Sequence, residues 1–165
     1  MKTVNEIGRL AKAAKTDIAK LSKNDKNALL LKIADAVVKN TPAILAANGK
    51  DMENAEQNGM SPAMQDRLLL TEARIAAMAD AVRKVVTLPD PVGEVLGGNT
   101  LANGLQMKKV RVPLGVVAMI FEARPNVSLD AASLCLKTGN CVILKGGSAA
   151  ACSNKAIIDT LRDVL

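Results

Sequence analysis

Apolar positions in the first 88 residues recur at the spacing of an α-helix. Residues 4–21 place Ile7, Leu10, Ala14 and Ile18 on one stripe, as an amphipathic helix requires. Similar patterns predict a helix between Ser22 and Asn40, one from Thr41 to about Gln57, a short one after Ser61-Pro62 and one from Thr71 through Val86. Leu88-Pro89-Asp90-Pro91 then stops helix formation. Residues 1–88 are therefore expected to form a helical region.

Two local details follow for the helix that starts near Thr41. Thr41 is expected to be its N-cap, with Pro42 at the first helical position. Gly49 in its middle is unfavourable for a helix, so we expect a local irregularity there.

The pattern changes after Gly93 and predicts strands. Residues 94–99 and 105–112 indicate a β-hairpin within residues 93–112, joined near Asn103-Gly104. In residues 113–165, two apolar runs without polar alternation, at 115–121 and 141–144, predict parallel strands buried on both faces. The helical pattern between them supplies the crossover. The predicted fold class is α/β: a helical amino-terminal region, a hairpin, then the first βαβ unit of a doubly wound sheet.

Composition narrows the class of protein. The chain has 165 residues with 49% apolar and 23% charged content, which suits one soluble globular domain. No apolar run approaches the ~20 residues of a membrane span, and MKTVNEIGRL has no signal-peptide core, so we expect a cytoplasmic protein without membrane partners. The net charge is +6, but the lysines are dispersed along the chain and do not form a basic cluster. The chain also has a single aromatic residue on which a base could stack. Both observations argue against nucleic-acid binding.

The chain lacks the usual ligands of a metal site. It contains no histidine, and its three cysteines, Cys135, Cys141 and Cys152, show no CxxC spacing. This argues against a metal centre, a disulfide framework and histidine-based acid–base chemistry. Cys135 and Cys141 fall in apolar segments, where cysteines usually act as small buried hydrophobes.

The candidate functional residues follow the two predicted parallel strands. Open α/β sheets bind their ligands at the carboxyl ends of their strands, so we expect a ligand site there. Lys145 follows the second strand and precedes Gly146-Gly147-Ser148 and a helix start. Glycines let a ligand approach the backbone, and helix N–H groups favour anions. A cation there suits a phosphate or a ribose. The alternative is a strand-end lysine that extends into solvent.

Two further residues follow the first strand. The Asn126 amide can donate to an oxyanion, or it can cap the helix that follows. The Arg124 guanidinium suits a carboxylate or an acyl phosphate, or it forms an ion pair with Glu122 or Asp130.

The segments FEARPN and LKTGNCVILKGGS resemble the γ-glutamyl phosphate reductase family (glutamate-5-semialdehyde dehydrogenases) of the aldehyde dehydrogenase superfamily. TPAILAANGKDMENA resembles it more loosely. The resemblance implies that residues 1–165 form the amino-terminal part of a Rossmann-like cofactor domain, without the catalytic domain. The family reaction is NADPH-dependent reduction of L-glutamyl 5-phosphate to L-glutamate 5-semialdehyde, with release of phosphate, in L-proline biosynthesis.

The resemblance also assigns expected roles. Asn126 matches the oxyanion-hole asparagine, Arg124 is the candidate substrate residue, and the nucleophilic cysteine lies beyond Leu165. The positions expected to bind NADP or NADPH are Glu122, Ala123, Pro125, Lys145, Gly146, Gly147 and Ser148. We expect a homo-oligomer, and no turnover from this chain alone. The alternatives are another aldehyde dehydrogenase, which the FEARPN segment argues against, and a non-catalytic module that binds a nucleotide or a partner.

Overall fold

The fold is a helical body with two small sheets. A computed structural model describes residues 3–165. The helical region comprises α1 (Val4–Lys20), α2 (Lys23–Lys39), α3 (Thr41–Gln57), α4 (Pro62–Leu68) and α5 (Glu72–Thr87). After it come β1 (Val95–Thr100), β2 (Gln106–Val110), β3 (Val116–Ile120), α6 (Asn126–Lys137), β4 (Cys141–Lys145), the 3-10 turn η1 (Ser148–Ala150) and α7 (Ala151–Arg162). β1 pairs antiparallel with β2, and β3 pairs parallel with β4. The predicted α/β class is confirmed.

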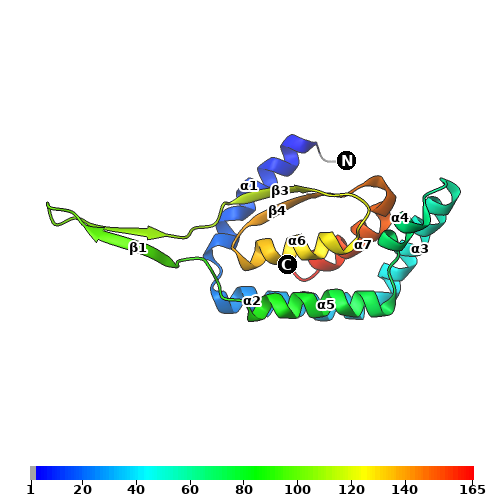
Figure 1. The fold of residues 1–165 in the computed structure, drawn as a ribbon, viewed down its shortest axis with the longest axis horizontal. Helices are drawn as coiled ribbons and strands as arrows, with labels where there is room; N and C mark the ends of the chain where they lie inside the picture. Colours follow the sequence, from blue (N-terminus) through cyan, green and yellow to red (C-terminus); the bar gives the residue numbers. More distant parts are fainter. Residues whose placement is uncertain (1–2) are drawn as a thin grey trace.

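The elements form layers around the parallel strand pair. α1 lies along one side of β3 and β4, and α6 lies along the other (Figure 1). α2 and α5 pack together beyond α6, and α3 packs against α7. The β1–β2 hairpin extends away from this body as an arm (Figure 1).

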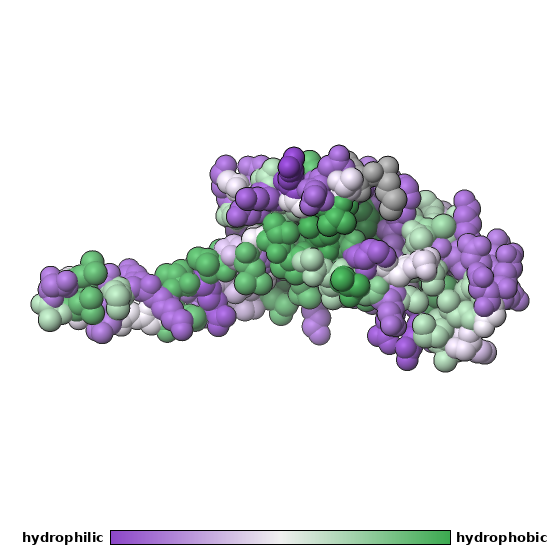
Figure 2. Space-filling view, turned by 90° about the horizontal axis from the view of Figure 1, so that it is seen from above, coloured by the Kyte–Doolittle hydropathy of each residue, from purple (hydrophilic) through white to green (hydrophobic). Residues whose placement is uncertain are grey.

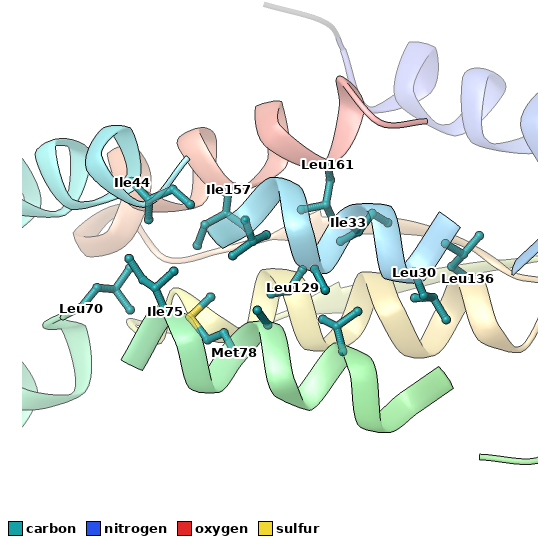
Figure 3. Packing of buried hydrophobic residues seen from close by; sticks show 14 residues of the cluster. Leu30, Ile33, Ile44, Leu70, Ile75, Met78, Leu129, Leu136, Ile157 and Leu161 are labelled. Atoms are coloured by element: carbon teal, nitrogen blue, oxygen red, sulfur yellow. The ribbon is translucent and has the colours of Figure 1, made fainter. Parts of the chain in front are cut away.

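The hydrophobic core lies between four helices. Side chains from α2, α5, α6 and α7 converge on one cluster (Figure 3), in which Leu30, Ile75, Leu129 and Ile157 are completely buried. Leu30 and Ile75 belong to helical patterns predicted from the sequence, and aliphatic side chains together with Met78 fill the space. The core therefore fixes α6, which begins at the candidate site.

The helices of the amino-terminal region follow the sequence signals except at two points of α3, its N-cap and its middle. Ser22 caps α2, and Thr71 caps α5. The N-cap of α3 is Asn40 rather than Thr41, so that prediction is wrong by one residue. α3 is also continuous through Gly49, so the predicted irregularity is wrong. The side chains of Asn48 and Asp51, on either side of Gly49, are buried and hydrogen-bonded to later parts of the chain, and these contacts outweigh the ~1 kcal/mol cost of glycine.

The hairpin turn uses its glycine differently from a two-residue Asn-Gly turn. The Gly104 N–H donates to the Leu101 carbonyl at 2.8 Å, and Gly104 has φ +84°. Asn103 keeps a negative φ and accepts from the Leu105 N–H at 3.1 Å. This is a turn closed by a left-handed glycine. All residues of β1 and β2 are exposed.

β3 departs from the expectation of a strand buried on both faces. Among residues 3–165 it pairs only with β4, and its last three residues are exposed, Ile120 to 83%. β4, between β3 and the helices, is mostly covered. Figure 2 shows apolar side chains gathered on the body beside the arm and continuing along it. The prediction of two buried faces is wrong for β3, because the described residues leave the last three side chains of this strand uncovered.

The α6–β4 connection ends the crossover tightly. The Asn140 N–H donates to the Cys135 carbonyl at 2.8 Å and the Gly139 N–H to Leu136 at 3.1 Å, with Gly139 at φ +71°. These bonds form a Schellman motif. The Asn140 side chain then accepts from the Gly115 N–H at 2.8 Å, which holds the starts of β3 and β4 together. No helix within residues 3–165 is long and apolar enough to cross a membrane.

Candidate functional site

The carboxyl ends of β3 and β4 lie side by side. The Phe121 N–H donates to the Lys145 carbonyl at 3.0 Å, and the Gly147 N–H donates to the Glu122 carbonyl at 3.3 Å. These bonds continue the parallel pairing beyond the strands. The two polar clusters singled out in the sequence are therefore neighbours, as their position after parallel strands predicted.

Lys145 ends β4 with its side chain in solvent. Its ammonium donates to the Gly146 carbonyl at 2.8 Å and forms no ion pair with any residue from 3 to 165. The Glu122 and Ser148 side chains are exposed nearby in the same turns. The lysine is thus both a solvated strand end and a cation that a ligand can reach.

Protein atoms occupy the space beside both glycines. A Cβ on Gly146 would lie 2.2 Å from Asn154 Nδ2, and one on Gly147 would lie 3.2 Å from the Glu122 carbonyl oxygen. Packing between the turns and α7 therefore accounts for both glycines without a ligand.

The amino terminus of α7 already holds an anion from the protein itself. The Cys152 and Ser153 N–H groups donate to the Asp51 carboxylate at 3.1 and 2.7 Å, and the Ser153 hydroxyl donates to it at 2.6 Å. Asp51 belongs to α3 and is buried. The Cys152 and Ser153 N–H groups are therefore not available to a ligand anion, because a carboxylate of the protein accepts from them.

Asn126 is not a helix cap. α6 begins at Asn126 itself, with Pro125 at the N-cap position and no side-chain capping bond. The Asn126 amide instead donates to Asp130 Oδ2, one turn along α6, at 3.0 Å. The capping alternative is wrong, because the preceding proline already takes the helical conformation and moves Asn126 inside the helix. One amide hydrogen of Asn126 has no acceptor among residues 3–165.

A cavity of about 440 Å³ opens beside this amide. α4, α5, α6 and the β3–α6 loop form its walls. Charged side chains surround it: Asp66, Arg67, Arg74, Arg124 and Asp130. Arg74 is held by Asp66 at 2.7 Å and by the Asp66 and Leu69 carbonyls. The cavity thus has basic walls and two carboxylates, next to a free amide hydrogen.

Arg124 lies between this cavity and a neighbouring one. It also lines a cavity of about 270 Å³, together with Phe121, Glu122 and Ala123. Arg124 is exposed and forms no ion pair with Glu122, Asp130 or any other described residue. The ion-pair alternative is therefore wrong for this structure, and the guanidinium is open to a ligand. Ala123 and Pro125 are buried. Ala123 lines the smaller cavity, whereas Pro125 lines neither of the two cavities.

The three thiols are poorly suited to nucleophilic catalysis. Burial raises the pKa of the Cys135 thiol, to which nearby Cys141 adds, and burial also raises the pKa of Cys141. A hydrogen bond and the charge of Asp51 raise the pKa of Cys152. Raised pKa values reduce the thiolate population. No cluster of potential metal ligands occurs within residues 3–165.

Sequence reasoning did not find the helical wall of the cavity. Arg67 and Arg74 are remote in sequence from FEARPN, and nothing local marks them. The spacing of Asn126 and Asp130 at i and i+4 on one helix face is the signal that could have linked those two residues.

The fold combines a parallel strand pair with polar strand ends, covering helices and a projecting hairpin. These features indicate one class of protein, which the comparison of sequences identifies. The aldehyde dehydrogenase family model matches residues 1–164, and the chain belongs to this family. The family uses nicotinamide cofactors.

Within the family, the chain is similar to γ-glutamyl phosphate reductases. It is 52% identical to the enzyme of Thermobifida fusca over 162 residues, which is 98% of this chain and 39% of that relative. Identity with the Pectobacterium carotovorum enzyme is 51% over the same shares. The crystal structure of the Thermotoga maritima enzyme matches with a TM-score of 0.96 and 37% identity, over 99% of this chain and 40% of that one. The chain thus spans about two-fifths of the length of these relatives.

Proposed function

We propose that this chain supplies the amino-terminal part of an NADPH-dependent reductase. The enzyme converts L-glutamyl 5-phosphate to L-glutamate 5-semialdehyde and phosphate, in L-proline biosynthesis. The observation that carries the proposal is the position of Asn126, whose amide faces a basic cavity directly beside the strand-end turns. The sequence identity of about one half with γ-glutamyl phosphate reductases, over nearly the whole of this chain, supports the proposal.

The residues at the strand ends fit a nucleotide. Lys145 and Ser148 present an ammonium and a hydroxyl, and Glu122 presents a carboxylate, all exposed in neighbouring turns. These groups suit the hydroxyls of a ribose. We place NADPH there, with Lys145 on the adenosine ribose, Gly146 and Gly147 shaping the turn that carries Lys145, and Ala123 along the cleft. When bound, the cofactor supplies the hydride.

Asn126 and Arg124 act on the substrate. The free amide hydrogen of Asn126 donates to the acyl oxygen as negative charge develops on it, which stabilises the transition state more than the ground state. Arg124 binds a negatively charged group of the substrate, a carboxylate or the acyl phosphate. The nucleophilic cysteine that displaces phosphate comes from outside these 165 residues, since the three thiols here have raised pKa values.

We also propose that the enzyme is a homo-oligomer in the cytoplasm. The β1–β2 arm exposes Leu96, Leu105 and Met107, and exposed apolar surface of this kind suits a protein partner. Cys135, Cys141 and Cys152 are free, which agrees with a reducing compartment.

A chimera tests the proposal. This chain replaces the matching 162 residues of the Thermobifida fusca reductase, with the unaltered relative as control. The reaction is followed in reverse, as reduction of NADP⁺ by glutamate 5-semialdehyde with and without phosphate. We expect phosphate-dependent turnover, and weaker activity with NAD⁺. Equal turnover with and without phosphate would instead indicate oxidation of a free aldehyde. If the chimera shows no turnover while the unaltered relative is active, this chain is a non-catalytic module.

A further inference from the structure

Asp130 is the carboxylate of the 440 Å³ cavity without a basic partner within residues 3–165. The second carboxylate, Asp66, is paired with Arg74 at 2.7 Å. Asp130 is half-buried, and its hydrogen bond comes from the neutral amide of Asn126 at 3.0 Å. A partly desolvated carboxylate gains from any cation that reaches it. In agreement, burial raises the pKa of Asp130, although the Asn126 bond opposes this.

We propose that Asp130 binds the α-ammonium group of the amino-acid substrate while Asn126 holds its acyl oxygen. The inference rests on the proposed function and names what makes the site select an amino acid. In a glutamyl group, two methylene carbons separate the acyl carbon from the α-carbon. The acyl oxygen and the α-ammonium nitrogen of one substrate molecule can therefore contact two protein groups that lie close together. Asn126 Nδ2 and Asp130 Oδ2 are such neighbours, 3.0 Å apart.

The other charges of the cavity suit the rest of this substrate. Arg67 and Arg124 line it without an ion pair to any residue from 3 to 165. A glutamyl phosphate carries a carboxylate and a phosphate beside its single ammonium group. Guanidinium groups bind both anions, which leaves Asp130 as the complement of the ammonium.

This contact also protects the bound substrate. In a glutamyl phosphate with a free amine, the nitrogen lone pair can attack the acyl carbon. A C–N bond then forms, the bond from carbon to the phosphate oxygen breaks, phosphate leaves and the nitrogen loses a proton, giving a five-membered lactam. A carboxylate that accepts from the ammonium keeps the proton on nitrogen and the lone pair unavailable. Asp130 thereby disfavours cyclisation in the site.

Binding to the chain itself is the first test. Uniformly ¹⁵N-labelled residues 1–165 are titrated with L-glutamate and with glutarate, which lacks the amine. We expect the backbone amide signals of Asn126 and Asp130 to shift more with L-glutamate. Asp130→Asn retains an oxygen that accepts from Asn126 and should remove the difference. Equal shifts with both ligands in the unaltered chain would overturn the proposal. Because this test needs no turnover, its result stands whether or not the chimera is active.

Kinetics in the chimera separate recognition from positioning. We expect the unaltered chimera to prefer L-glutamate 5-semialdehyde over glutarate semialdehyde in kcat/KM, and Asp130→Asn to lower this preference about tenfold or more. If Asp130 only orients Asn126, both substrates lose the same factor, and the proposal is overturned. Absence of phosphate-dependent turnover in the unaltered chimera would count against the proposed function, and the titration would still decide the role of Asp130.

Discussion

Polar groups in the helical body are bound to one another, whereas those at the strand ends are not. Asn48, Asp51 and Ser153 form a closed buried network between α3 and α7, and no buried side-chain nitrogen or oxygen among the described residues lacks a partner. Arg124 and Lys145, by contrast, form no ion pair within residues 3–165. The difference separates groups that stabilise the fold from groups left available to a ligand. Substitutions in the body should therefore reduce stability, and substitutions at the strand ends should reduce function.

The largest effect should come from the core. Leu129→Ala removes a completely buried side chain from α6 and should lower the free energy of unfolding by about 2–5 kcal/mol. Leu105→Ala, on the arm, removes a side chain that is 57% exposed and should change stability by less than about 0.5 kcal/mol. Urea denaturation of residues 1–165 measures both. Similar losses would mean that the arm packs against something in solution.

Asn126→Ala should reduce turnover far more than stability. Loss of an oxyanion donor costs about 2.7–4 kcal/mol of transition-state stabilisation, or 10²–10³ in kcat. The unfolding free energy should fall by only about 1 kcal/mol, because the variant loses the hydrogen bond to Asp130 but no helix cap. The chimera supplies kcat, and thermal melting supplies stability. Normal turnover with a lower melting temperature would return Asn126 to a structural role.

Asp51→Ala should destabilise the helical body, because Asp51 joins α3 to the start of α7. It leaves the Cys152 and Ser153 N–H groups without their acceptor, and hydrogen bonds to a charged group contribute about 1.5–3 kcal/mol. Asp51→Asn retains one acceptor oxygen and should lose less. Denaturation of all three proteins gives the order. An Asn variant as unstable as the Ala variant would show that the charge matters more than the bonds.

Lys145→Ala should weaken NADPH binding and leave stability unchanged. The loss of one charge-assisted contact predicts about 1.5 kcal/mol, the lower end of the usual range, because the ammonium is solvated when free. Fluorescence titration of the chimera with NADPH measures this, with Lys84→Ala, on the exposed side of α5, as the matched control. Equal affinity in both variants would leave Lys145 as a solvated strand end.

The smallest expected effect is a pH dependence of stability that comes from the buried ion pair between Lys26 of α2 and Asp90. Lys26 contacts Asp90 at 2.5 Å. Burial alone would raise the pKa of Asp90, but the hydrogen bonds from Lys26 and the Val92 N–H hold it below its usual value of 3.8. The ionised carboxylate therefore contributes stability that is present above pH 3.8 and is lost as the pH falls through the lower folded-state pKa. Unfolding curves from pH 6 to pH 2 should show this loss, and Asp90→Asn should reduce it.

Most of the helical region could be predicted from neighbours along the chain, although the N-cap of α3 and its continuity through Gly49 could not. The apolar spacing of the helices that follow Ser22 and Thr71 is a local signal, and both helices form where it predicts them. The meeting of Glu122 with Lys145 also followed from one rule, that adjacent parallel strands end at the same edge.

Contacts between distant segments could not be predicted in this way. Asp51 and Ser153 are about one hundred residues apart, and either residue alone looks like a surface polar group. The same holds for Arg67 and Arg74, which reach the cavity only because α4 and α5 pack beside α6. Asn126 showed the opposite problem, since a strong local preference for capping was overridden by the helical conformation of Pro125.

The Asp51 carboxylate, which α3 supplies to the start of α7, bears on how the chain acquires its structure. A helix whose first N–H groups are satisfied by its own N-cap can begin to form as soon as that segment exists. α7 has no such side chain, and its first turn is completed only when α3 is in place. The two helices therefore gain stability together, as one cooperative unit that joins the amino-terminal helical region to the last helix of the chain described. The turn after β4, which packs against α7 through Gly146 and Asn154, becomes ordered within that unit.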